Sequence, residues 1–242
     1  GKKFLKNCLG SIFANEYKNY EVIVVDNKSR DGSIDKVEKI FGAKKNLKII
    51  RNVKNTGPAA GLNLGVIQAK GKYIAILGYD TKVDKKWLSS YVDFMEKNEN
   101  VGIAQGKLMR MSEKGRFFYA GDFLGPFGFL IERSRSARDE GQFDKVVEIF
   151  GINSATMIMR KDLFDELGGF DDEFFVYLEE ADLCFRTHLA GKKVVYFPDS
   201  IVYHHDSVKV KSKKYFAENM RNYYGCRNYI WMLIKNLGMK NL

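Results

Sequence analysis

The segment Tyr20-Glu21-Val22-Ile23-Val24-Val25-Asp26-Asn27 decides the fold class that this sequence predicts. Residues 20–25 form a short run rich in β-branched side chains, which is typical of a buried strand, and Asp26 begins the loop after it. Residues 33–41 then repeat apolar side chains at helical spacing. A buried strand followed at once by an amphipathic helix is the repeating unit of an α/β protein.

The same alternation continues along the chain. We expect helices over residues 2–14, 33–41, 59–69 and 87–97, and strands over residues 20–25, 47–51, 73–77 and 101–109. Alternating strands and helices with short connections predict a mainly parallel sheet that helices cover on both faces. Because the sequence has three Pro, no repeat and no obvious linker, we expect one domain over residues 1–242.

The start of the chain departs from this pattern. It opens directly with a helix, whereas a doubly wound sheet normally begins with a strand. Either the fold begins unusually, or a strand that precedes the helix is absent from this sequence. We favour the second interpretation.

The composition is basic, with 40 Lys and Arg against 30 Asp and Glu and a formal net charge of +10. Residues 1–54 hold 13 basic and 6 acidic side chains, and residues 206–242 hold 8 and 2. Such an excess favours an anionic partner, which can be nucleic acid, a phosphorylated ligand or an acidic membrane. Because the excess gathers at the two ends of the chain, it argues against an evenly basic nucleic-acid-binding surface.

Two further features of the composition bear on location. The apolar runs are far shorter than the roughly 18 residues that cross a bilayer. The three Cys are too few and too scattered for a disulfide framework or a zinc cluster, which indicates a reducing compartment. We therefore expect a cytoplasmic protein, with the inner face of the cell membrane as a further possible location.

Two acids follow predicted strands, Asp26 after residues 20–25 and Asp80 after residues 73–77. In open parallel sheets, ligands bind beyond the carboxyl ends of the strands. A single acid in this position is as often a turn residue or a helix cap. The glycine-rich crossover at residues 55–65 strengthens the ligand interpretation, because its glycines allow close backbone approach and the next helix offers free amides to an anion.

A second cluster of acids lies at residues 168–186. Glu179 and Glu180 follow an aromatic-rich run, where partial burial would raise the pKa of a carboxyl and suit a general base. Ordinary first-turn acids of a helix are the alternative, and Asp182 with Arg186 can be a structural pair. Downstream, His204 lies among acids, where it can bind metal or phosphate or serve the structure.

Together these segments resemble family 2 glycosyltransferases of the GT-A fold, especially enzymes similar to the rhamnosyltransferases of polysaccharide assembly. The resemblance covers roughly residues 2–236, in family order and at family-like spacing. The matching pieces are residues 5–12, 21–33 and 55–65, the strand that ends in Asp80-Thr81, the block 169–186, and His204. The resemblance implies a three-layer α/β/α sandwich with a mostly parallel sheet, here apparently without its first strand.

The resemblance also implies roles for the residues above. The positions that match the family's nucleotide-sugar pocket are Asp26, Asn55, Gly57, Gly61, Asn63 and Glu179. Asp80 matches the last acid of the family's DxD motif and His204 a C-terminal His, which together would hold Mg²⁺ or Mn²⁺ on the donor diphosphate. Glu180 matches the general base, and Asp182 is the rival base.

The reaction implied is an inverting transfer of a sugar from a nucleotide-diphosphate sugar to a hydroxyl of a saccharide or lipid-linked saccharide acceptor, in cell-surface polysaccharide synthesis. Residues 1–110 would bind the donor and residues 111–212 the acceptor. Residues 213–242 would form an amphipathic helix, packed on the core or lying on an anionic membrane. The alternatives are a non-catalytic sugar-nucleotide or glycan-binding module and a sugar nucleotidyltransferase. Nucleic acid is not expected as a partner.

The sequence departs from the family pattern in two further places. Gly78 stands where the family has the first acid of its metal motif, so one ribose or metal contact is lost and metal dependence is less secure. The pair that contains the base is Glu179-Glu180, whereas the family has Glu-Asp, so the catalytic carboxyl reaches one methylene further. This longer reach keeps Asp182 open as a rival base.

Overall fold

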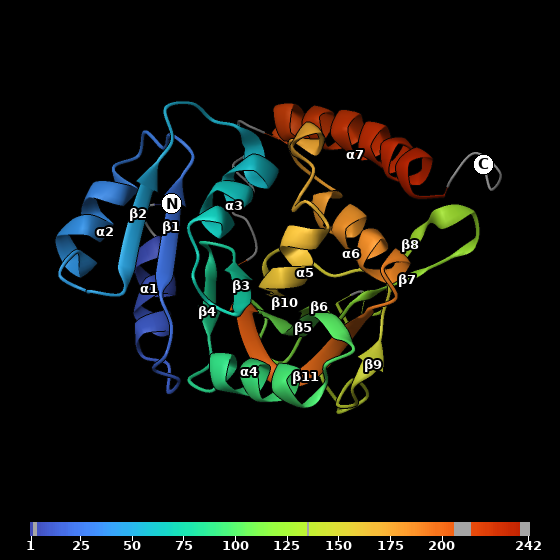
Figure 1. Cartoon of the computed structure of the whole chain (residues 1–242), viewed down its shortest axis with the longest axis horizontal. Coiled ribbons are helices and arrows are strands. Elements are labelled where there is room, and N and C mark those ends of the chain that lie inside the picture. The colour runs from blue at the N-terminus through green and yellow to red at the C-terminus, as the bar shows by residue number, and fades with distance from the viewer. Residues whose placement is uncertain (2–3, 135, 206–213, 238–242) are drawn as a thin grey trace.

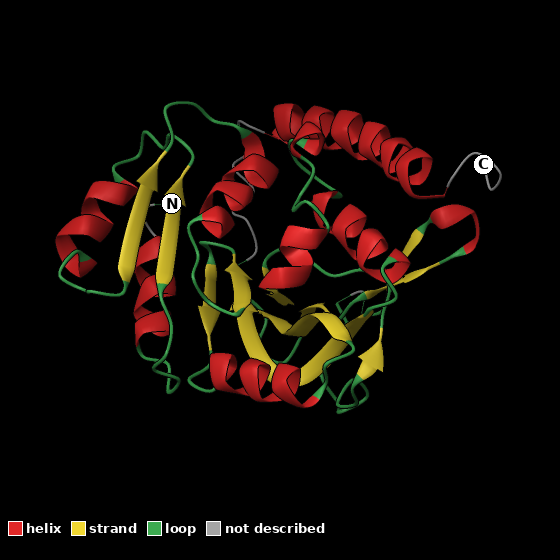
Figure 2. Cartoon of the chain, viewed as in Figure 1, coloured by secondary structure: helices red, strands yellow, loops and turns green. Residues whose placement is uncertain are grey.

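The structure of the chain, a computed structural model, describes residues 1, 4–134, 136–205 and 214–237, with the backbone alone for residues 214–218. Helices and strands alternate along it (Figures 1 and 2). The helices are α1 (Leu5–Phe13), α2 (Ser33–Phe41), α3 (Gly57–Ile67), α4 (Trp87–Lys97), α5 (Lys161–Glu166), α6 (Glu179–Leu189) and α7 (Lys214–Leu237), with single 3₁₀ turns η1 (Pro126–Gly128) and η2 (Asp172–Phe174). The strands are β1 (Val22–Asp26), β2 (Leu47–Arg51), β3 (Tyr73–Leu77), β4 (Thr81–Val83), β5 (Val101–Arg110), β6 (Phe117–Tyr119), β7 (Asp122–Leu124), β8 (Leu130–Glu132), β9 (Val147–Glu148), β10 (Thr156–Arg160) and β11 (Lys193–His204).

The predicted elements of the first half are largely confirmed. The bounds of α2, α4, β2 and β3 are those expected from the apolar spacing. Helix α3 begins two residues earlier than expected, at Gly57, because Pro58 has the fixed φ of a first helical turn and needs no amide partner there. Strand β4 was not predicted, since three residues are too short for a period to be recognised.

The sheet is mixed, so the expectation of a mostly parallel sheet is wrong. Strands β1 and β2 pair in parallel as a separate two-stranded sheet. In the larger sheet, of order β3-β10-β5-β11-β4, strands β5 and β11 are parallel, but β3–β10, β10–β5 and β11–β4 are antiparallel. An apolar run predicts that a strand is buried, but it does not encode the direction of its neighbours.

The described parts of β1 and β3 form no ladder with each other, and each is an edge of its own sheet.

Helices cover both faces of the larger sheet, as the α/β/α prediction requires. Side chains of α1, α2 and α4 pack in one buried cluster, with Leu9, Val37 and Tyr91 among them. Side chains of α3, α5 and α6 pack in a second cluster, which includes Ala59 and Leu183. Figure 1 shows α4 below the sheet and α3, α5 and α6 above it.

Helix α7 adds a further layer above α6 (Figure 1). Met232 is fully buried there in a small cluster with Phe174, Ala181 and Phe185. The helix lies within the predicted range 213–242, whose residues 213 and 238–242 lie outside the described residues. In the described part of the chain, no helix combines the length and mean hydropathy needed to cross a bilayer.

Candidate active site

Asp80 and His204 come together at the junction of β4 and β11. Asp80 directly precedes β4, and His204 ends β11 opposite Thr81 in the antiparallel pairing of these strands. Asp80 Oδ1 lies 3.5 Å from His204 Nε2, and both side chains are largely buried. The backbone amide of His205 donates to the Asp80 carbonyl at 2.9 Å, which fixes the turn. Two residues expected at one metal site are thus neighbours in space.

The turn in front of Asp80 is tightly packed around Gly78. Its carbonyl accepts from the Thr81 hydroxyl at 2.7 Å and from Cys8 Sγ on α1 at 3.6 Å. A Cβ on Gly78 would lie 3.1 Å from Asp80 Oδ1, so a side chain there would press on the carboxylate. Burial raises the pKa of the Cys8 thiol to about 11, which makes it a neutral packing group.

The donor set of this pair fits a divalent cation held jointly with a ligand. Within residues 1, 4–134, 136–205 and 214–237 no group of three or more His, Cys, Asp or Glu could hold a metal alone. Asp80 and His204 offer one carboxylate oxygen and one imidazole nitrogen, which leaves several positions of an octahedral ion for diphosphate oxygens and water. The predicted metal role of these residues therefore remains consistent with their chemistry, and stays a prediction.

Glu179 and Glu180 occupy the first turn of α6, near the positive end of the helix dipole. Burial raises the pKa of both carboxyls, that of Glu180 to about 8, and the neighbouring Glu179 carboxylate contributes to the rise at Glu180. In the described part of the chain, no hydrogen-bond partner reaches the buried Oε2 atom of either residue. Buried polar atoms are normally paired, so these two oxygens make Glu179 and Glu180 candidates for contact with a substrate group.

A short turn connects these acids to the Asp80 loop. A backbone hydrogen bond from Ser154 partly offsets the raised pKa of Glu180. The next residue, Ala155, accepts from the Gly78 amide at 3.0 Å. Glu180 and the loop that ends in Asp80 are therefore attached to consecutive residues of one turn, ahead of β10.

Asp182, the rival base, has its carboxylate fully engaged. It is completely buried, and its Oδ2 accepts from Arg186 Nε at 2.8 Å. Its Oδ1 accepts from Asn236 Nδ2 on α7 at 2.8 Å. A carboxylate bound on both oxygens is poorly placed to take a proton from a substrate, so these contacts favour Glu180 as the base.

Asp26 ends β1 and is mostly buried. Its Oδ1 accepts from the Ser29 amide at 3.0 Å, an ordinary turn contact. Sequence analysis assigned no role to the following residue, Asn27, although its side chain hydrogen-bonds to two other segments. Its Oδ1 accepts from Asn52 Nδ2 at 2.9 Å, and its Nδ2 donates to the Gly57 carbonyl at 2.7 Å. Its position directly after Asp26 was the available signal.

The glycine-rich crossover brings α3 close to its neighbours. Asn55 is exposed and accepts from the Gly57 amide at 3.0 Å. Gly57 has φ +83°, and a Cβ there would lie 2.4 Å from the Phe175 carbonyl oxygen; a Cβ on Gly61 would lie 3.2 Å from Asn27 Nδ2. Packing and backbone conformation therefore require glycine at position 57, and a side chain at position 61 would press on Asn27, whether or not these glycines also face a nucleotide.

Asn63 has contacts that favour a structural role over the predicted nucleotide contact. Its Nδ2 donates to the Phe170 carbonyl and to Asp172 Oδ1, each at 2.7 Å. Its Oδ1 accepts from the Phe170 amide at 2.9 Å. The hydrogen bonds of the Asn63 side chain thus connect α3 to the loop that leads to the acids of α6.

Asp122, at the start of β7, is a further acid that sequence analysis did not identify. Burial raises its pKa to about 6, and its charge in turn opposes ionisation of Glu180. It lies within residues 111–152, which matched no motif that sequence reasoning could use.

The layered sheet, the paired Asp80 and His204, and the buried acids of α6 define a GT-A glycosyltransferase domain. GalNAc-T7, solved with UDP, GalNAc and Mn²⁺, shares this fold at a TM-score of 0.72 and 16% identity, over 86% of this chain and 42% of that one. The mannosyltransferase PcManGT from Pyrobaculum calidifontis, solved with GDP-Man and Mn²⁺, shares the fold at a TM-score of 0.65 and 16% identity, over 87% of this chain and 55% of that one.

Sequence comparison identifies the family. The profile of Glycosyl transferase family 2 matches residues 1–168, and the chain belongs to this family. The O-antigen biosynthesis protein RfbC of Myxococcus xanthus is 26% identical over 211 residues, which are 84% of this chain and 16% of RfbC. The predictions of the family, of a glycosyltransferase domain and of a GT-A α/β fold are confirmed, although the sheet is mixed. The chain spans 22%, 20% and 35% of the length of the first three curated relatives that it matches.

Proposed function

We propose that this protein transfers a sugar, with inversion, from a nucleotide-diphosphate sugar to an acceptor hydroxyl. The observation that carries the proposal is the Glu180 carboxyl, which is buried at the start of α6 with a pKa raised to about 8. A carboxylate of this basicity accepts a proton from a hydroxyl far better than an ordinary Glu does.

The reaction is a single displacement. The acceptor oxygen forms a bond to the anomeric carbon while the bond from that carbon to the diphosphate oxygen breaks, and Glu180 takes the hydroxyl proton. Asp80 and His204 would hold the divalent cation, which supplies charge neutralisation for the leaving diphosphate when bound. The first turn of α3, packed closely through Gly57, would offer its amides to the donor phosphates.

The substrate class rests on relatives. Both solved neighbours named above contain a nucleotide or nucleotide sugar together with Mn²⁺. RfbC, by its name, acts in O-antigen biosynthesis. We infer from these a nucleotide-diphosphate sugar donor and a saccharide or lipid-linked saccharide acceptor of a cell-surface polysaccharide. All three cysteines are free, which fits a reducing cytoplasmic location.

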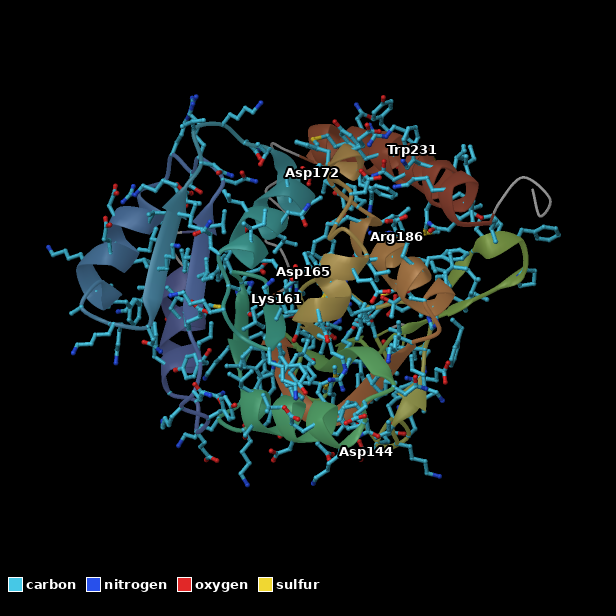
Figure 3. The ribbon with its side chains drawn as sticks, in the orientation of Figure 1. Asp144, Lys161, Asp165, Asp172, Arg186 and Trp231 are labelled. Atoms are coloured by element: carbon cyan, nitrogen blue, oxygen red, sulfur yellow. The ribbon has the colours of Figure 1, made fainter. Side chains whose placement is uncertain are left out.

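We also propose that the outer face of α7 rests on an anionic membrane. Tyr223, Ile230, Trp231 and Ile234 are exposed on this face, opposite the fully buried Met232. Figure 3 shows Trp231 on α7 and Arg186 on the underlying α6. Residues 206–242 hold eight basic and two acidic side chains, and a segment with such a basic excess is attracted to acidic lipids.

The β7–β8 hairpin continues this apolar surface. Phe129 stacks on Tyr229 of α7 with ring centroids 5.3 Å apart, and the Tyr229 hydroxyl donates to the Phe127 carbonyl. Phe127, at the hairpin tip, is 87% exposed. Two elements far apart in the sequence thus share one exposed apolar surface, as a membrane-docking face requires.

The deciding experiment measures nucleoside diphosphate release from UDP-GlcNAc, GDP-mannose and dTDP-rhamnose, with Mn²⁺ or Mg²⁺ and with or without saccharide acceptors. We expect release with one donor, and we expect Glu180→Gln to lower it by about 10² to 10⁴ while donor binding is kept. Glu173→Gln, an exposed acid shortly before α6, is the matched control. Donor binding without release in the wild-type protein would instead indicate a sugar-nucleotide-binding module.

A further inference from the structure

The loop that leads into Glu179 and Glu180 has an uncommon backbone. Phe175, Tyr177 and Leu178 all have positive φ, at 60°, 70° and 67°, and none of them is glycine. This is a backbone conformation that residues other than glycine rarely adopt, because their Cβ crowds the neighbouring carbonyl. Three such conformations just before the candidate base form only where the surrounding structure holds them.

Asn228 of α7 supplies much of this support. It is fully buried, and its Nδ2 lies 2.9 Å from the carbonyl oxygens of Phe174 and Val176 and 2.7 Å from that of Tyr177. The two N–H groups of this side chain are thus shared among three loop carbonyls, of which that of Phe174 also accepts from the Val176 amide.

The orientation of the Asn228 amide is itself fixed. Arg227 Nε donates to Asn228 Oδ1 at 2.8 Å, so the NH₂ group is the one turned toward the loop. Arg227 also donates through its Nη2 to the Glu173 carbonyl at 2.6 Å. Neighbouring residues of α7 therefore act as one set of donors to the backbone of the loop.

Further contacts of α7 extend along the same segment. Met232 packs on Phe174, and the Phe175 and Tyr224 rings lie 5.4 Å apart. Lys235 forms an ion pair with Asp171, at the start of the segment. On its other side the loop meets α3, where a Cβ on Gly57 would clash with the Phe175 carbonyl oxygen. The loop is therefore enclosed between α3 and α7.

We propose that Asn228 is a positioning residue, which holds the left-handed loop so that the first turn of α6 presents Glu180 to the acceptor. The proposal rests on the proposed role of Glu180 as the base. It concerns residues beyond 168, where the family match ends. The consequence is that α7 takes part in the reaction indirectly, besides any contact that its outer face makes.

The test compares Asn228→Ala and Asn228→Asp with the wild-type protein. The Asp variant keeps the size of the side chain but replaces the donor NH₂ by an oxygen that faces carbonyl oxygens. Asn222→Asp, an exposed position of the same helix, is the matched control. Donor turnover is measured as nucleoside diphosphate release from the nucleotide sugar that the screen above identifies.

We expect kcat to fall about 10- to 100-fold in both Asn228 variants, with the donor KM within about threefold, because displacement of a catalytic group by about 1 Å has effects of this size. The pH profile provides a second readout. Water admitted by a loosened loop lowers the pKa of Glu180, so the acidic limb of kcat/KM moves below pH 8. The groups that face Glu180, namely Glu179, Cys184, Tyr119 and Asp122, are unchanged in these variants.

Hydrogen exchange separates this proposal from the proposed function. The amides of residues 174–180 should exchange faster in the Asn228 variants than in the wild-type protein. Their exchange rate should be unchanged in Asn222→Asp, whether or not any donor is turned over. Unchanged exchange of these amides overturns the proposal that Asn228 holds the loop. A loss of kcat without a shift of the acidic limb overturns the positioning of Glu180. A wild-type protein that releases no nucleotide overturns the proposed function. Hydrogen exchange then still tests whether Asn228 holds the loop.

Discussion

Asp80 Oδ1 and His204 Nε2 lie 3.5 Å apart, on the two sides of the β4–β11 junction. The backbone hydrogen bond from the His205 amide to the Asp80 carbonyl helps to hold this arrangement. The two ligands of the expected cation are therefore pre-arranged by strand pairing, which lowers the entropic cost of binding it.

We expect Asp80→Asn and His204→Ala each to weaken the Mn²⁺-dependent part of nucleotide binding by about tenfold or more, since even outer-shell substitutions have effects of this size. The measurement is calorimetric titration with UDP and GDP, with and without Mn²⁺. Asp84→Asn is the control, because Asp84 is exposed and caps the Lys86 amide. Equal stimulation by Mn²⁺ in all variants would exclude a cation at this pair.

We expect the raised pKa of Glu180 to set the pH dependence of turnover. Because its pKa is raised to about 8, the fraction that can accept a proton falls about tenfold for each pH unit below that value. We expect kcat/KM to follow this slope from pH 8 down to pH 6. A flat profile in this range contradicts the assignment of Glu180 as the base.

The same group affects stability. Between pH 4.5 and 8 the folded protein binds the Glu180 proton more tightly than the unfolded chain does, so the stabilisation it provides is lost as pH rises. Urea unfolding at pH 6 and pH 9 should show this loss, at roughly up to 1.4 kcal/mol per pH unit, and Glu180→Gln should reduce it.

Asp182 should behave as a structural residue. Its pair with Arg186 is buried, so Asp182→Ala should lower the free energy of unfolding by about 3–5 kcal/mol. Asp165→Ala, which breaks the exposed pair with Lys161, should cost less than about 1 kcal/mol. The milder Asp182→Asn should keep turnover per folded molecule, measured with folded protein counted by tryptophan fluorescence. A loss as deep as that of Glu180→Gln would restore Asp182 as the base.

The outer face of α7 should bind acidic vesicles. Ile230→Glu combined with Trp231→Glu should reduce flotation with phosphatidylglycerol vesicles at least tenfold, because it removes apolar contact and adds like charge. Asn222→Glu controls for the added charge on an exposed position of α7. Pure phosphatidylcholine vesicles should bind more weakly than acidic ones. Absence of flotation of the wild-type protein would reject the membrane face.

Local pattern was sufficient for most elements of the first half of the chain, with the three-residue strand β4 as the exception. Strands β2 and β3 and helices α2 and α4 have the expected bounds, because apolar spacing and helix limits are properties of neighbouring residues. The direction of β10 beside β3 and β5 was not predictable in this way. Strand direction depends on chain returns that no local period records.

For the candidate site, sequence motifs selected residues, and the structure added the contacts that these residues make. The Asn63 amide and the Asp182 carboxylate bind groups within the protein, and their predicted roles stay predictions. Asn27, Asp122 and Asn228 escaped notice, because an Asn or Asp in a loop or helix carries no mark of the backbone groups that it will meet.

The amino-acid sequence by itself determined the α/β class, the glycosyltransferase family and the acids of α6, since these follow from periodicity and short ordered motifs. The resemblance already placed Asp80 and His204 at one site. Tertiary structure alone decided that Glu180 rather than Asp182 keeps an unpartnered oxygen within the described residues, and that Asn228 Nδ2 meets the carbonyls of the left-handed loop. The physical reason is that hydrogen-bond satisfaction and burial belong to atoms brought together from distant segments, and only the folded chain brings them together.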